Sequence, residues 1–207
     1  GTGGPAGATY TWTPSTFLDN PNIAQPTSSA PFTFTYTLTV TQNGCVRTDQ
    51  VTVNVNSLPT PTISGVAEIC EGESTTLTAA GGTSYAWNTG ENTASITVNP
   101  GVTSTYTVTV TDGNSCSNTA SQVVVVNPNP VAVIVGDPVV CEDQTTSITA
   151  SGAVAGGTYN WSTGESTATI EVSPTDIETY TVTVTDVNGC TDVTSVTVTA
   201  APDPVIV

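Results

Sequence analysis

The chain has 207 residues, 17 acidic residues, one basic residue, no histidine and a formal net charge of −16. Nucleic-acid binding requires clustered Lys and Arg, so this charge excludes it, and it also disfavours docking on anionic lipid. Without His or Lys, the chain cannot build a Ser-His-Asp triad, a Cys-His pair, a Schiff base, a P-loop or a His-ligated metal site. We therefore expect no enzyme activity, no catalytic residue, no cofactor and no membrane insertion.

Two motifs recur three times along the chain, which indicates a tandem repeat. The first is Tyr-x-Trp and the second is Thr-Tyr-Thr-(Leu/Val)-Thr-Val, and each second motif is followed by a turn and a cysteine. The motifs begin at Tyr10, Tyr85 and Tyr159, and at Thr35, Thr105 and Thr179. Matching positions lie about 70–75 residues apart. One period therefore has room for about seven short strands, as in a β-sandwich.

The pattern within one copy predicts strands throughout and no helix. Thr and Val dominate, and both favour pleated sheets. In residues 103–111, Tyr106, Val108 and Val110 face one side of a strand and threonines face the other. The second copy is predicted to form strands at residues 61–64, 75–79, 84–88, 94–98, 103–111 and 122–127. The predicted core aromatic residues are Trp12, Trp87, Trp161, Tyr36, Tyr106 and Tyr180.

Proline-rich joints divide the chain into domains. We predict a first domain at 1–58 that lacks its strands A and B, whole domains at 59–128 and 129–200, and the first strand of a following domain at 201–207. On this interpretation the chain is a segment of a longer array, or a subunit whose split domain is completed by a neighbour.

The ordered motifs support a family resemblance. A Cys-x-Gly-x-Ser-x-x-Leu-Thr-Ala strand at 70–79 precedes Tyr-x-Trp-(Asn/Ser)-Thr-Gly at 85–90, then Thr-Tyr-Thr-Val-Thr-Val-Thr-Asp at 105–112. The third copy ends its matching series with Asn-Gly-Cys at 188–190. This series resembles the tandem immunoglobulin-like/PKD-like repeats of giant, type IX-secreted, gliding-adhesin-like surface adhesins of Bacteroidota. The PKD signature Trp-Asp-Phe-Gly-Asp-Gly is absent, so the immunoglobulin-like label fits better.

The resemblance implies an all-β chain of immunoglobulin-like sandwiches arranged end to end as a rod. It further implies a non-enzymatic structural or adhesive role at the cell surface, as the stalk or fibre of an adhesin. The expected partners are neighbouring domains of the same long chain or neighbouring filament subunits.

The five cysteines are expected to form disulfides, because the chain has no Cys-x-x-Cys pair and no histidine for zinc. Pairing within a copy would join Cys70 to Cys116 and Cys141 to Cys190. In an immunoglobulin topology, however, Cys70 and Cys116 lie at opposite poles about 20–26 Å apart. A disulfide needs Cα atoms within about 7 Å. We therefore favour Cys70–Cys190 across the domain joint, with Cys45, Cys116 and Cys141 paired outside the sequence, and keep the within-copy pairing as the alternative.

Acidic residues concentrate at turns, where they favour solubility and tight turns. A second interpretation is calcium at the joint, because Glu71, Glu73, Asp186 and Asn188 would offer oxygen ligands from both domains.

Two further functions stay open at this point. The divergent segment 15–31 of the first copy could recognise a glycan or a protein. Alternatively, residues 200–207 could add a strand to the incomplete first domain of the next subunit and so build a filament. The candidate contact residues of segment 15–31 are Phe17, Asn20, Asn22 and Gln25.

Overall fold

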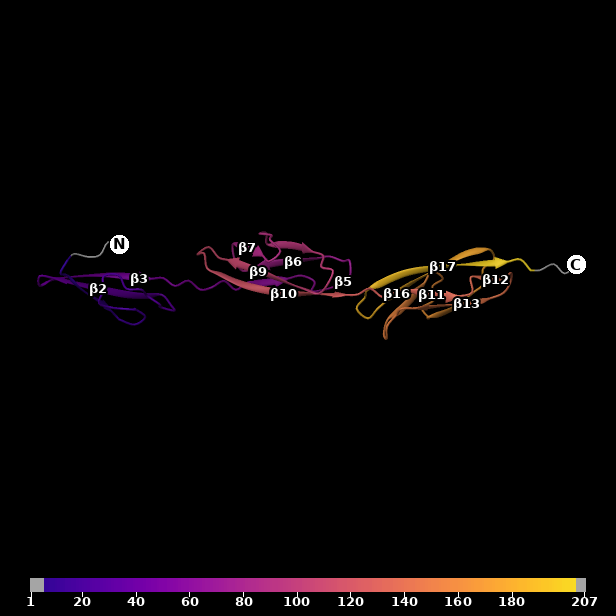
Figure 1. The fold of residues 1–207 in the computed structure, drawn as a ribbon, viewed down its shortest axis with the longest axis horizontal. Helices are drawn as coiled ribbons and strands as arrows, with labels where there is room; N and C mark the ends of the chain where they lie inside the picture. The colour runs from indigo at the N-terminus through magenta and orange to yellow at the C-terminus, as the bar shows by residue number, and fades with distance from the viewer. Residues whose placement is uncertain (1–5, 204–207) are drawn as a thin grey trace. The chain divides into compact units, whose positions relative to one another are not determined.

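The computed structural model of the protein describes residues 6–203, which form seventeen β-strands (Figure 1). These residues contain no helix, and so none that is long and apolar enough to cross a membrane. The chain divides into two compact units. One unit holds residues 1–61, 81–85 and 109–119, and the other holds residues 62–80, 86–108 and 120–207.

The first copy forms one three-stranded antiparallel sheet in the order β1-β2-β3. Its strands are β1 (Thr9–Thr13), β2 (Phe34–Gln42) and β3 (Cys45–Val53). A two-residue turn joins β2 to β3, with φ of 50° at Asn43 and 80° at Gly44. Positive φ at both central residues matches the twist of a tight hairpin, and Asn-Gly is the sequence that best tolerates it.

The second copy forms two sheets, in the orders β4-β6-β8 and β5-β10-β9-β7. The first sheet contains β4 (Thr62–Ser64), β6 (Thr75–Ala80) and β8 (Ser95–Val98). The second contains β5 (Glu68–Cys70), β7 (Ser84–Trp87), β9 (Ser104–Thr111) and β10 (Ser117–Asn127). The three residues of β5 run parallel to the end of β10.

The third copy repeats this arrangement with the sheet orders β11-β13-β15 and β12-β17-β16-β14. Its first sheet contains β11 (Val133–Gly136), β13 (Thr146–Ser151) and β15 (Thr169–Val172). Its second contains β12 (Val139–Cys141), β14 (Thr158–Trp161), β16 (Ile177–Thr185) and β17 (Thr191–Ala201), and β12 runs parallel to the end of β17.

In both complete copies the first sheet contains strands A, B and E, and the second contains C, F and G with an extra strand A′ beside G. This order is that of an immunoglobulin-like sandwich, so the predicted all-β fold class of tandem immunoglobulin-like domains is confirmed.

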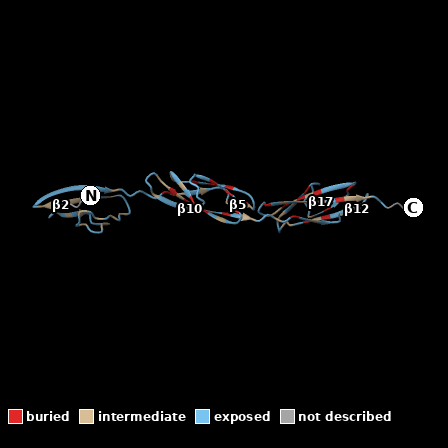
Figure 2. Cartoon of the chain, turned by 45° about the horizontal axis from the view of Figure 1, so that its top comes forward, coloured by how far each residue is buried: buried red, intermediate tan, exposed pale blue. Residues whose placement is uncertain are grey.

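The core of the third copy lies between its two sheets (Figure 2), and along β13, β15 and β16 buried residues alternate with more exposed ones. From β16, Tyr180, Val182 and Val184 point inward, as the alternation predicts. Trp161 is 3% exposed, and its indole Nε1 donates to the carbonyl of Thr167 at 2.9 Å. The side chains opposite come from β13 and β15 and are Ile148, Ala150, Ile170 and Val172.

The structure corrects the sequence prediction at three points. Trp12 is half-buried rather than a closed core residue, because no second sheet covers β1 among the described residues. Strand β10 begins at Ser117 instead of residue 122, and the strands β5 and β12 were not predicted at all. The other predicted core aromatics are buried: Trp87, Trp161, Tyr36, Tyr106 and Tyr180.

Replacing Trp161, the central tryptophan of the third copy, should destabilise that copy. Trp161→Ala is expected to lower the free energy of opening by about 3–5 kcal/mol, because it removes a large buried ring and leaves a cavity. Amide hydrogen exchange across β13–β17 measures this loss. Trp12→Ala is the matched control at the same repeat position, and it should cost clearly less because Trp12 is half-buried. Equal losses would contradict the difference between the two environments.

The stability of the third copy should fall between pH 10 and 12. Burial, together with the hydrogen bond that the Tyr180 hydroxyl donates to Glu178 at 2.7 Å, raises the pKa of Tyr180 from 10.0 to about 12. The unfolded chain releases this proton near its ordinary pKa, so the contribution is complete below about pH 10 and is lost as pH rises through about 12. Denaturant unfolding across this range tests it. Glu178→Gln should lower the pKa of Tyr180, read from tyrosinate absorbance, and an unchanged titration would contradict the role of Glu178.

Candidate functional site

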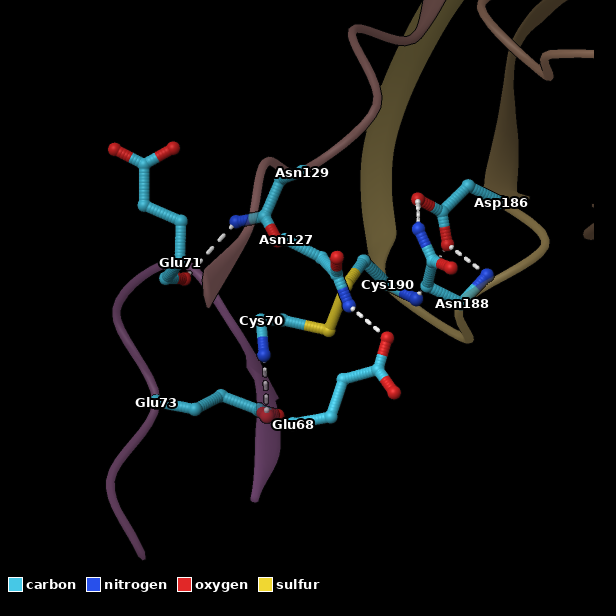
Figure 3. Close-up of a disulfide and its surroundings, with 9 residues drawn as sticks. All are labelled: Glu68, Cys70, Glu71, Glu73, Asn127, Asn129, Asp186, Asn188 and Cys190. Atoms are coloured by element: carbon cyan, nitrogen blue, oxygen red, sulfur yellow. Dashed lines mark hydrogen bonds between the residues drawn. A yellow bond between two sulfur atoms is a disulfide. The ribbon is translucent and has the colours of Figure 1, made fainter. Parts of the chain in front are cut away.

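A disulfide joins Cys70 at the end of β5 to Cys190 immediately before β17 (Figure 3). The two Cα atoms are 5.5 Å apart, and the residues are separated by 120 positions in the sequence. Cys190 is 1% exposed. The bond links the second copy to the third, as the favoured prediction of a disulfide across the domain joint requires. The alternative pairing of Cys70 with Cys116 within the second copy does not occur, because Cys116 is a free thiol.

Parallel strand pairing places Cys70. In the register of β5 against β10, Cys70 lies opposite Asn127, the last residue of β10. The backbone amide of Glu71 then donates to the carbonyl of Asn127 at 2.9 Å. The turn that follows is closed by Glu73, whose amide donates to the carbonyl of Cys70 and whose carboxylate accepts from the amide of Cys70. These bonds hold Cys70 beside the point where the chain leaves the second copy.

An aspartate-centred turn places Cys190. One carboxylate oxygen of Asp186 accepts the backbone amides of Asn188 at 2.9 Å and of Cys190 at 2.8 Å. The Asp186 amide in turn donates to the carbonyl of Cys190 at 2.9 Å, and Gly189 supplies a positive φ of 85°. Asp and Gly are suited to such a turn because Asp bonds amides ahead of it and Gly tolerates positive φ.

The joint between the two copies carries two further side-chain bonds (Figure 3). The amide group of Asn127 donates to the carboxylate of Glu68 at 2.8 Å, and that of Asn129 donates to the carbonyl of Glu71 at 3.2 Å. Sequence reasoning missed these contacts. The Asn-Pro-Asn-Pro motif at 127–130 could have indicated them, because the prolines fix the backbone and leave the asparagine side chains as the available donors.

The calcium candidates do not gather into one site. Asp186 and Asn188 bond each other within their own turn, while Glu73 is bonded to the amide of Cys70. The carboxylate of Glu71 points away from Asp186 (Figure 3). Within residues 6–203, no three His, Cys, Asp or Glu side chains are grouped so that they could hold a metal ion.

The three remaining cysteines occupy repeat positions equivalent to the bonded pair. Cys141 ends β12 opposite Ala201, as Cys70 ends β5 opposite Asn127. Cys116 follows a turn in which Asp112 accepts the Cys116 amide at 2.9 Å, as Asp186 does for Cys190. Cys45 follows the two-residue turn of the first copy. All three are free thiols in this chain; Cys45 and Cys141 are exposed and Cys116 is partly exposed.

The candidate binding segment 15–31 uses its side chains to hold itself together. The ring of Phe17 meets the rings of Phe32 and Phe34 edge to face, with centroids 5.6 and 5.8 Å apart. The Asn20 side chain accepts the amide of Asn22 at 2.9 Å.

The carboxylate of Asp19 links two parts of the same segment by hydrogen bonds. It accepts the amides of Thr27 and Asn20, and these two bonds lower the pKa of Asp19. The ring of Phe17 and the side-chain oxygen of Asn20 therefore take part in contacts within the first copy.

No protein-family model matches the chain, and no curated protein matches its sequence. Similar solved structures include the three-immunoglobulin-domain structure of titin domains I67–I69, with 13% identity, a TM-score of 0.44, and coverage of 97% of this chain and 90% of that chain. Extracellular domains 3–5 of Drosophila OTK are 12% identical with a TM-score of 0.41, and the match covers 95% of this chain and 86% of that chain. The insect immune protein hemolin is 13% identical with a TM-score of 0.37, covering 95% and 68%. The immunoglobulin-like assignment rests on the strand order described above.

Weakening the turn before Cys190 should expose the disulfide. In Asp186→Ala, two backbone amides lose their acceptor, at a cost of about 1–3 kcal/mol, and dithiothreitol should reduce Cys70–Cys190 faster. Asp186→Asn keeps an acceptor oxygen and should behave more like the parent. Asp112→Ala removes the equivalent turn of the second copy and should leave the reduction rate unchanged. A common rate for Asp186→Ala and Asp112→Ala would refute the positioning role of Asp186.

Proposed function

We propose that this chain is part of a non-enzymatic extracellular array, the stalk or fibre of a bacterial cell-surface adhesin, in which disulfides carry tension past folded repeats. The observation that carries the proposal is the Cys70–Cys190 bond and its separation of 120 residues. Tension that enters at the N-terminal side reaches Cys70, crosses the two sulfur atoms and leaves through β17. The residues between the cysteines lie in a closed loop outside this covalent path.

The loop holds most of the second copy and most of the third. A fully extended chain spans at most about 3.3–3.6 Å per residue. Because the disulfide prevents the 120-residue loop from being stretched, the fully extended chain is about 400 Å shorter than it would be without the bond. A stalk that connects a surface to a distant tip benefits from a fixed length, and this bond supplies one even where a sandwich unfolds.

The other three cysteines occupy equivalent repeat positions and would form disulfides of the same kind. Cys141 would bond the cysteine before strand G of a following repeat, as Cys70 bonds Cys190. Cys45 and Cys116 would bond A′-strand cysteines of other repeats. Such bonds form and persist in oxidising compartments, which supports an extracellular location. The chain also has no His and no Lys, so its repeats lack the usual bases and nucleophile activators.

Single-molecule stretching of the full chain from its two ends tests the proposal. The oxidised chain should never release the loop, whereas Cys70→Ser should gain about 400 Å of contour length on complete unfolding. Cys116→Ser is the matched control because Cys116 is a free thiol in this chain, and it should stretch like the parent. The proposal fails if Cys70→Ser and the parent reach the same contour length.

A further inference from the structure

Strand β11, the A strand of the third copy, lies at the edge of the sheet β11-β13-β15 and belongs to an apolar stripe on the outer side of that sheet. The stripe consists of Val131, Val133 and Val135, which are 72%, 45% and 60% exposed. Ile134 faces the other way and packs against the core. Neighbouring exposed apolar side chains on a soluble domain indicate an interaction site.

The A strand of the second copy is polar at the same positions. Ile63 lies opposite Ala79 in β6, as Ile134 lies opposite Ala150 in β13. This register aligns the valine stripe with three exposed hydroxyl residues, Thr60, Thr62 and Ser64. Because the same sandwich forms with either set of residues, the fold itself does not require the valines.

Strand β11 also lacks the two devices that commonly keep an edge strand from pairing, which are proline and charge. In the second copy Pro61, which has no amide hydrogen, occupies the position of Ala132. The opposite edge strand of the same sheet, β15, carries Glu171. Residues 131–136 contain neither a proline nor a charged residue, although the chain has a net charge of −16.

The hydrogen-bond pattern shows which main-chain groups face the open edge. The amide of Ala150 donates to the carbonyl of Ala168 at 2.8 Å, so the main-chain groups of Ala150 point towards β15. In an antiparallel ladder, the residue opposite such a position also points its groups away from the pair, and that residue is Ile134. The amide of Ala132, two residues earlier, likewise points out of the ladder and donates to the carboxylate of Asp192 at 2.9 Å. The N–H and C=O of Ile134 therefore face the edge, where they can bond a further strand.

We propose that β11 pairs antiparallel with β11 of a second molecule of this chain, about a two-fold axis at Ile134. The two Ile134 residues then exchange N–H···O=C bonds with each other. Val133 lies opposite Val135 of the second molecule, and the two-fold axis makes this pair occur twice. Residue pairs that do not exchange main-chain bonds bring their side chains closest together, so four valines meet on the outer face.

The charge distribution favours a second molecule as the occupant. A two-fold contact places the same surface on both sides, so an uncharged strand meets an uncharged strand. In this register Asp137 lies opposite Val131 and not opposite another acidic residue. A basic strand from a different protein would find no acidic residue within 131–136 to pair with.

This contact would hold two stalks side by side. It goes beyond the proposed tension-bearing function, which is tested at Cys70 and Cys190, so that either proposal can fail without the other.

Sedimentation of the full chain over a range of concentrations tests the pairing, with the free thiols alkylated so that no disulfide forms between molecules. Dimers should form, and more strongly in about 0.5 M NaCl than in low salt, because salt screens the repulsion between two acidic molecules. Val133→Thr combined with Val135→Ser introduces the residues of the second copy and should weaken dimerisation by about tenfold or more. The matched control is Val123→Thr with Val125→Thr, since these exposed valines lie on β10 inside its sheet, and it should dimerise like the parent.

Cross-linking tests the register in a background where the free thiols Cys45, Cys116 and Cys141 are replaced by Ser. A mixture of Val133→Cys and Val135→Cys chains should form a disulfide-linked pair under mild oxidation. Either variant alone should link poorly, because identical positions are diagonal neighbours about 7–8 Å apart, beyond the Cα separation of about 7 Å that a disulfide tolerates.

Selective linkage of the mixture supports the pairing even where the Thr/Ser variant does not fold. The proposal is overturned by equal weakening in the β10 and β11 variants, or by the absence of selective linkage. A chain that stays monomeric at every concentration also overturns it, and would leave this edge to a strand of a different protein.

Discussion

The parallel pairing of a three-residue strand with the end of strand G is the interaction on which the rest of this structure depends. In the second copy it brings Cys70 opposite Asn127, so that the cysteine lies where the chain leaves the domain. Without this pairing, strand G would stop three residues earlier, as β3 does in the first copy. A ladder of very few hydrogen bonds therefore determines both where the disulfide can form and how far strand G extends.

Threonine explains how a chain with so few charges keeps its sheets together. Pairs of threonine hydroxyls bond each other across neighbouring strands on the outer faces, as Thr76 does with Thr97 and Thr179 with Thr197, both at 3.2 Å. Cross-strand pairs of this kind stabilise a sheet without any ion pair. The inner faces can then be filled by Val, Ile and Trp, and the acidic residues are free to form turns such as that of Asp186.

Much of the fold could be predicted because the governing patterns are long. The alternation through Tyr106, Val108 and Val110 identifies a half-buried strand over eight residues, and the threefold recurrence of Tyr-x-Trp gives the repeat. Strand β5 could not be found in this way, since three residues are too few to show a period of two. The half-buried state of Trp12 was missed for another reason. Its local sequence matches that of Trp87, and the two differ in the second sheet, which the described residues of the first copy do not form.

The disulfide also determines what a cut in the backbone does to the molecule. Cys70 and Cys190 enclose most of two sandwiches, including the exposed turns at which a protease would act first. A single cleavage anywhere inside that loop leaves the portions before and after it in one covalent molecule. Integrity of the chain therefore depends less on each peptide bond of the enclosed repeats than on two sulfur atoms, of which the one on Cys190 belongs to a residue that is only 1% exposed.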